Sequence, residues 1–120
     1  MDNGITIKVP DLIGSSLCIS AEDGQKIFDK IEPLLKNGKQ ITISFKNITM
    51  LISLFLNVSI GQLYGTFSEE DIRAQVKVEG LSSDDLELLK SVVDNAKKYY
   101  TNPKGYDDAW LDEEEDENEQ

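Results

Sequence analysis

The sequence has no histidine and only one cysteine, Cys18, among its 120 residues. Without histidine it lacks the commonest general base and the commonest neutral metal ligand. A lone cysteine cannot form an internal disulfide, and a zinc site usually draws on several Cys and His side chains. Cys18 lies in a predicted strand with no cation beside it to lower its pKa, so we interpret it as a buried structural thiol. These absences favour a protein that is not an enzyme and that holds no metal ion or cofactor.

Two further patterns of catalytic chemistry are missing. The sequence has no Walker-type or dinucleotide-binding glycine motif. Carboxylates are plentiful, but the pattern places most of them on exposed helix faces or near the C-terminus, without the convergent arrangement that catalysis needs. An enzyme that works through carboxylates is therefore the weakest hypothesis.

Long hydrophobic runs are also missing. No apolar segment approaches the roughly 18–20 residues that cross a bilayer. The first four residues, Met1-Asp2-Asn3-Gly4, lack the basic and apolar segments of a secretory signal. Together with the single cysteine, these features predict a cytoplasmic protein that does not act at a membrane.

Basic residues are scarce at one end of the chain. The formal net charge is −11, but positions 107–120 hold nine acidic residues and no basic one. Residues 1–106 hold the other 14 acidic residues and all 12 basic ones, a net charge of −2. We therefore predict a single domain over residues 1–106, followed by a disordered acidic tail over 107–120. No basic surplus exists to bind the phosphates of nucleic acid.

Alternation of apolar and polar residues predicts four strands. They are residues 5–9, 16–19, 40–45 and 75–79, and the second lies close enough to the first to suggest a hairpin through the turn residues 10–14.

Helical periodicity predicts three helices and one short helical turn. The first helix begins after the N-cap Ser20, and Pro33 is expected to break it before Asn37-Gly38 ends it. Residues 54–64, apolar on nearly every side, predict a central buried helix. Residues 68–71 form a capped helical turn. The last helix starts at Ser82 or Ser83 and buries a stripe of residues: Leu86, Leu89, Val93, Ala96 and Tyr100.

This order, β-β-α-β-α-β-α, predicts the α/β class. The helical crossovers between the later strands favour parallel pairing. We therefore expect one domain with a mixed, mostly parallel four-stranded sheet and helices packed on it.

One segment carries a more specific signal. Residues 41–64 combine the alternating strand that ends at Phe45, then Ile48, then Phe55-Leu56-Asn57, and finally Ile60-Gly61-Gln62-Leu63-Tyr64. This stretch resembles the STAS domains (sulfate transporter and anti-sigma factor antagonist). It is most similar to the STAS-like branch of unknown function that occurs in bacteria and their mobile elements. The predicted element order agrees with that fold over residues 4–101.

The resemblance implies a regulatory, non-enzymatic role. Anti-sigma factor antagonists bind a kinase-like ATPase or anti-sigma factor, and phosphorylation of a serine at the start of this helix switches them off. Counted from Ile48, that serine position falls on Leu54, and the acidic residue usual two positions earlier falls on Ile52. Leucine cannot be phosphorylated, so Ser53 is the candidate for modification and Thr49 a weaker one. Helix capping is the structural alternative for Ser53.

Two hypotheses of different class follow. In the first, a protein partner binds the loop from Lys46 to Ser53 and the start of the next helix, so that the predicted contact residues are Lys46, Thr49, Ser53, Leu54 and Asn57. In the second, the tail 107–120 acts as an acidic decoy that inhibits a nucleic-acid-binding protein. In the tail, Trp110 beside Leu111 either contacts a partner or folds back on the last helix near Tyr99 and Tyr106. Deleting the tail separates the hypotheses, because only the decoy loses binding.

Overall fold

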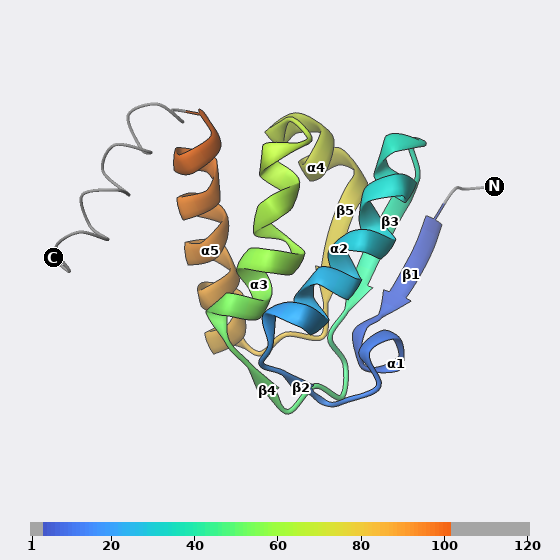
Figure 1. The fold of residues 1–120 in the computed structure, drawn as a ribbon, viewed down its shortest axis with the longest axis vertical. Helices are drawn as coiled ribbons and strands as arrows, with labels where there is room; N and C mark the ends of the chain where they lie inside the picture. Colours follow the sequence, from blue (N-terminus) through green and yellow to red (C-terminus); the bar gives the residue numbers. More distant parts are fainter. Residues whose placement is uncertain (1–3, 102–120) are drawn as a thin grey trace, which may run out of the picture.

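The structure, a computed structural model, describes residues 4–101. Over this range, eleven helices and strands form two parallel sheets with helices packed beside them (Figure 1). In chain order they are β1 (Gly4–Lys8), α1 (Val9–Ile13), β2 (Leu17–Cys18), α2 (Ala21–Lys36), β3 (Gln40–Ser44), β4 (Met50–Leu51), α3 (Ser53–Ser59), the 3-10 helix η1 (Gly61–Gly65), α4 (Glu69–Gln75), β5 (Val76–Glu79) and α5 (Ser83–Thr101).

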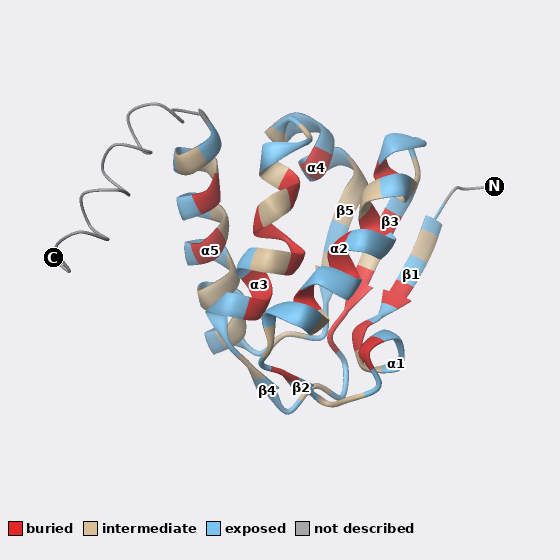
Figure 2. Cartoon of the chain, viewed as in Figure 1, coloured by how far each residue is buried: buried red, intermediate tan, exposed pale blue. Residues whose placement is uncertain are grey.

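The main sheet has three strands in the order β1-β3-β5, and both pairings are parallel. Its β-branched residues alternate, so one face carries isoleucine and valine while the other is polar. Ile7 pairs with Ile43, and Ile43 pairs with Val78, on the face that the helices cover. The next row, Lys8, Ser44 and Glu79, lies on the opposite face, where Lys8 and Glu79 are exposed. The helices therefore lie on the isoleucine face, as the buried residues in Figure 2 indicate.

The predicted four-stranded sheet and its hairpin are wrong. Residues 9–13 form the short helix α1, which ends at Gly14 in the left-handed region (φ 73°) with its N–H bonded to the Pro10 carbonyl. This helical turn carries the chain away from the edge of β1. The second predicted strand, β2, therefore pairs in parallel with β4, a strand that we did not predict. Neither sheet is mixed, because every pairing is parallel.

Helix α2 begins at the predicted cap, where the Ser20 hydroxyl accepts the Asp23 N–H at 3.0 Å. The expected break at Pro33 does not occur, since α2 runs without interruption to Lys36. Pro33 is exposed in the last turns of the helix, while Ile31 and Leu35 on either side of it are buried in the core. The packing of these two residues holds the last turn in place despite the backbone hydrogen bond that proline removes.

Close contact between α2 and α3 depends on Gly24. A Cβ atom at this position would lie 2.9 Å from the Phe55 carbonyl oxygen and 3.1 Å from Val58 Cβ. Glycine therefore allows the start of α2 to approach the backbone of α3. Phe55 and Leu56, on the other side of this contact, have no exposed surface.

The predicted helix over residues 54–64 divides in two. Helix α3 ends at Ser59, whose hydroxyl donates to the Phe55 carbonyl at 2.8 Å, and the chain continues as η1. Gly61 is buried where this segment packs against Val92 and Ala96 of α5. The burial predicted for the whole segment is only partly correct, because Leu54 and Asn57 are exposed.

The short helical turn after Ser68 and the strand after Gln75 are confirmed as α4 and β5. Helix α5 is capped by Ser82, which accepts the Asp85 N–H at 3.1 Å. Its buried residues are Val92 and Ala96, while Leu89 and Val93 are half-buried and Leu86 and Tyr100 are exposed, so the predicted stripe is confirmed only in its middle. No helix between Gly4 and Thr101 combines the length and the apolar character that crossing a bilayer requires.

Candidate functional site: an apolar surface on β2, β4 and α3

The small sheet presents an apolar outer side. Leu17 pairs with Met50 and Cys18 with Leu51, and the Ile52 N–H continues the ladder to the Cys18 carbonyl at 3.1 Å. Because side chains alternate along a strand, Cys18 and Leu51 point inward, and their neighbours on both strands point outward. Cys18 is fully buried, whereas Met50 is 53% exposed.

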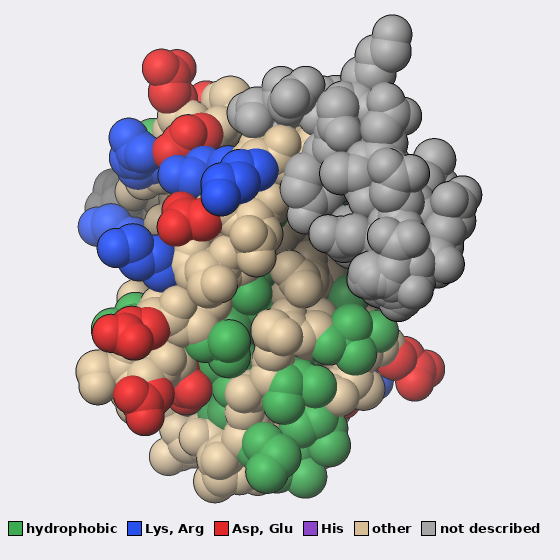
Figure 3. Space-filling model, turned by 90° about the vertical axis from the view of Figure 1, so that its left-hand side faces the viewer, with side chains coloured by type: hydrophobic (Ala, Val, Ile, Leu, Met, Phe, Trp, Pro, Cys, Tyr) green, Lys and Arg blue, Asp and Glu red, His purple; other side chains and the backbone are tan. Residues whose placement is uncertain are grey.

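Five large apolar side chains are exposed on this end of the domain. They are Leu17, Ile19, Met50, Ile52 and Leu54, and we call them the β2–β4 patch. Apolar side chains gather in the lower part of the face in Figure 3, the end of the molecule where β2, β4 and the start of α3 lie. Single exposed apolar residues are ordinary, but a contiguous group marks an interaction surface.

Three of the predicted contact residues lie together on α3, and one of them, Leu54, belongs to the patch. Ser53 is the first residue of the helix and is exposed, Leu54 is 46% exposed, and Asn57 is exposed one turn later. Among residues 4–101 no side chain caps α3, whose N-cap is Ile52, so Ser53 does not have the capping role that we considered. Its hydroxyl is therefore placed at the surface, in the middle of an apolar neighbourhood.

The other two described contact residues have structural partners. The Thr49 hydroxyl donates to the Ser16 carbonyl at 3.3 Å, and the Thr49 N–H bonds to the same carbonyl at 2.8 Å. These bonds therefore link Thr49, the residue before β4, to Ser16, the residue before β2. Lys46 forms an exposed ion pair with Glu79 at 3.8 Å, at the end of the main sheet. Trp110 and the tail 107–120 lie outside the described residues.

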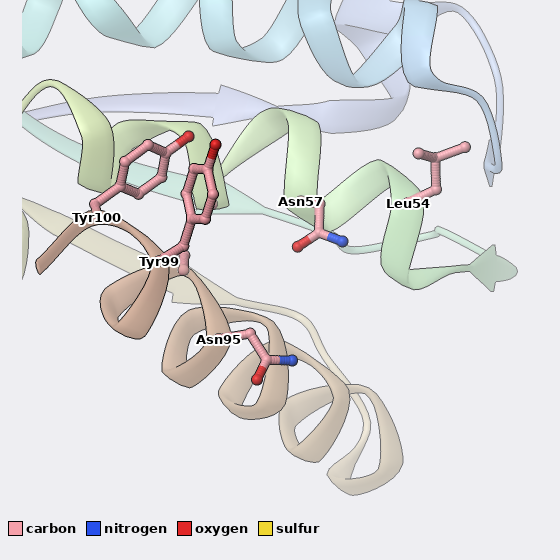
Figure 4. Close-up of a pocket in the computed structure, with 7 residues that line it drawn as sticks. Leu54, Asn57, Asn95, Tyr99 and Tyr100 are labelled. Carbon is pink, nitrogen blue, oxygen red and sulfur yellow. The ribbon is translucent and has the colours of Figure 1, made fainter. Parts of the chain in front are cut away.

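A groove begins at Leu54 and runs between α3, η1 and α5 (Figure 4). It has a volume of about 590 Å³ and is lined by Leu54, Asn57, Gly61, Asn95, Ala96, Tyr99 and Tyr100. Leu54 and Asn57 project from α3, and the two tyrosines lie at the far end on α5. Their rings meet edge to face with centroids 4.7 Å apart. Burial raises the pKa of Tyr100, and the neighbouring Tyr99 adds to this shift, so the phenol is neutral at physiological pH.

The thiol of Cys18 confirms the prediction of a buried structural cysteine. Burial raises its pKa to about 12, and the Asp23 carboxylate adds to the shift. The thiol therefore stays protonated at neutral pH, and a protonated thiol is a poor nucleophile and metal ligand. Within the part of the chain that the structure describes, no three His, Cys, Asp or Glu side chains are grouped to hold a metal ion.

The sequence reasoning missed four members of the patch and the α5 side of the groove. The missed patch residues are Leu17, Ile19, Met50 and Ile52. A signal was present, because Met50-Leu51-Ile52 repeats the pattern of Leu17-Cys18-Ile19. A strand of two residues is too short for periodicity to identify it without knowledge of its partner.

The fold and the patch define a class of small α/β domains with a parallel sheet and an exposed apolar end. A family model described as a STAS-like domain of unknown function matches residues 23–86, which is more than half of the chain. The chain therefore belongs to the STAS-like domains of unknown function, and the resemblance drawn from residues 41–64 is confirmed. No match was found among curated proteins or among solved structures.

Proposed function

We propose that this STAS-like domain is a non-enzymatic regulatory module that binds a partner protein through the β2–β4 patch. One observation carries the proposal: five large apolar side chains are exposed together at the end of the domain, and Leu54 is among them. Desolvation of such side chains drives protein association. The polar Ser53 and Asn57 beside Leu54 supply the rim that contact surfaces usually have.

The proposed partner is a kinase-like ATPase or an anti-sigma factor. Membership of the STAS-like family supports this class, since anti-sigma factor antagonists use the start of the corresponding helix. At that position this chain has Leu54, which adds apolar area and cannot be phosphorylated. The module therefore binds without the usual switch at this residue.

Ser53 offers a route to a phosphorylation switch at this surface. It is exposed and is flanked by Ile52 and Leu54 of the patch. A phosphate at Ser53 would add close to two negative charges within an apolar contact, and such a group cannot be desolvated cheaply. We expect Ser53→Asp to weaken binding and Ser53→Ala to retain it.

The test is affinity purification of the full-length chain from its native cell, with identification of the proteins that co-purify. We expect recovery of a kinase-like ATPase or an anti-sigma factor with the wild type and its loss with Leu54→Glu. Leu12→Glu is the matched control, because Leu12 on α1 is 38% exposed and is not part of the patch.

Tail deletion keeps this proposal distinct from the acidic decoy. The module predicts that a chain without residues 107–120 still binds its partner. Recovery of a basic nucleic-acid-binding protein that is lost on this deletion would instead favour the decoy, and so would equal recovery by Leu54→Glu and the wild type.

A further inference from the structure

The groove from Leu54 to Tyr100 ends close to the last residue of the chain that the structure describes. The structure describes the chain as far as Thr101, at the end of α5, and the groove reaches Tyr100, one residue before that point. The remaining 19 residues include Trp110, the only tryptophan of the sequence, next to Leu111. We propose that Trp110 and Leu111 fold back into this groove and cover Leu54.

The length of chain allows this contact. Nine residue steps separate Trp110 from Thr101, and they span up to about 30 Å when the chain is extended at about 3.3–3.6 Å per step. Asn95, in the middle of the groove, lies six residues before Thr101 on α5, about 9 Å back along the helix axis at 1.5 Å per residue. The segment therefore reaches along the groove with slack to spare.

The lining of the groove suits an indole ring. Tyr99, Tyr100 and Ala96 provide apolar surface on the α5 side, and Leu54 provides it on the α3 side. Asn57 and Asn95 supply side-chain amides that can accept a hydrogen bond from the indole N–H. A tryptophan needs such a combination, because its ring is apolar and its N–H requires a partner when buried.

Charge alone does not hold the tail to the domain. Residues 1–106 have a net charge of −2 and the tail holds nine acidic residues, so the general interaction is repulsive. The exposed Lys98 precedes the two tyrosines in the sequence of α5 and provides one cation on this helix. The apolar contact of Trp110 and Leu111 must therefore provide the docking energy, and the acidic residues that follow them remain in solvent.

Docking of the tail would compete with the partner, a consequence that rests on the proposed function. Leu54 belongs both to the groove and to the β2–β4 patch, so a docked Trp110 and a bound partner exclude each other. A connection of this length gives an effective concentration near the millimolar range. An intrinsic dissociation constant of about 0.1 mM would then keep the groove about nine-tenths occupied.

The direct test uses the fluorescence of Trp110 in the full-length chain, without any partner. We expect the emission to be blue-shifted relative to the urea-unfolded chain and protected from a soluble quencher, at all protein concentrations. Leu54→Glu and Tyr100→Ala, from opposite ends of the groove, should each shift the emission to the red and expose Trp110. Leu12→Glu, the matched exposed leucine, should leave the emission unchanged, and circular dichroism confirms that each variant is folded.

Several results would overturn the proposal. They are a wild-type emission equal to that of the unfolded chain, an emission that Leu54→Glu and Tyr100→Ala leave unchanged, and an emission that changes on dilution, which would assign the contact to a second copy.

A second readout separates this proposal from the proposed function. Trp110→Ala should tighten the binding of the co-purified partner about tenfold, the factor expected when about one molecule in ten has a free surface. An unchanged affinity of Trp110→Ala for the partner would rule out competition by the tail. Loss of binding in Leu54→Glu would still support the proposed binding module. The acidic decoy predicts the opposite sign, because Trp110→Ala would then weaken binding.

Discussion

The main sheet and the small sheet use the same alternating pattern with opposite outcomes. In β3, Ile41 and Ile43 are buried because α2 and the helices after it cover that face. In β2 and β4, the outward residues Leu17 and Met50 remain exposed although they are as apolar as those two isoleucines. Alternation therefore tells which residues share a face, and only the packing of other elements decides whether that face is a core or a surface.

The same contrast occurs within one helix turn. Phe55 and Leu56 of α3 have no exposed surface, whereas Leu54 is 46% exposed. Phe55 and Leu56 therefore contribute to the core, whereas Leu54 is available for the proposed contact with a partner. Substitutions on the two sides of this boundary should therefore have separable effects.

The largest expected effect comes from the buried side of α3. Phe55→Ala removes a fully buried ring from the centre of the core and should lower the free energy of unfolding by about 3–5 kcal/mol. Leu54→Ala, one residue away, should change it by less than about 0.5 kcal/mol, as surface substitutions usually do. Urea denaturation of both variants measures the difference. Similar losses of unfolding free energy in the two variants would contradict it.

A smaller loss of stability should follow from placing a methyl group between α2 and α3. Gly24→Ala places a Cβ atom 2.9 Å from the Phe55 carbonyl oxygen, a backbone atom that cannot rotate away. We expect a loss of about 1–3 kcal/mol in the free energy of unfolding. Gly61→Ala is the control, because its Cβ atom would meet only ordinary contacts of 3.5 Å and longer. Equal stability of Gly24→Ala and the wild type would show that the two helices can move apart.

The next largest loss of stability is expected from removing the N-terminal cap of α5. The sequence left Ser82 and Ser83 as alternatives, and the structure assigns the capping bond to Ser82. Ser82→Ala should cost about 1 kcal/mol of stability, and Ser83→Ala should cost almost nothing because alanine is favoured inside a helix. Thermal unfolding of the pair measures the difference, and a reversed order would contradict the assignment.

The smallest effect concerns an exposed cluster far from the patch. A hydrogen bond from Lys97 lowers the pKa of Glu69, and the ion pair joins their side chains at 2.9 Å. A carboxyl group with a lowered pKa in the folded state stabilises the protein above its ordinary pKa, and this contribution is lost as the pH falls through the lowered value. Glu69→Gln should therefore be slightly less stable than the wild type at neutral pH and equal to it in acid. Equal stability of Glu69→Gln and the wild type at neutral pH would contradict this account.

Local signals predicted most of the elements. Ser20, Ser68 and the serines before α5 identified helix starts, because each offers a side-chain oxygen to an unpaired N–H. Strand β3 was clear from its β-branched alternation. Pairing was not predictable in the same way, because the helical turn at Val9–Ile13 separates β1 from β2 and only the folded chain shows that β2 joins β4.

The candidate site was predicted in part for the same reason. Leu54 and Ser53 followed from the resemblance of residues 41–64 to a family motif, and this motif lies on one continuous segment. Leu17 and Ile19 join the site only through a long-range pairing with Met50 and Leu51 and the bond from Ile52. The α5 side of the groove likewise depends on how α5 packs against α3. Contacts between distant segments were therefore the part that sequence patterns could not supply.

The most direct test of the central claim is a binding titration of the co-purified partner with the wild type, Leu54→Glu and Leu12→Glu. We predict that Leu54→Glu weakens binding by at least about thirtyfold, the loss typical of a central contact residue of about 2 kcal/mol, and that Leu12→Glu binds like the wild type. Equal affinity of folded Leu54→Glu and the wild type would contradict the assignment of the β2–β4 patch as the contact surface.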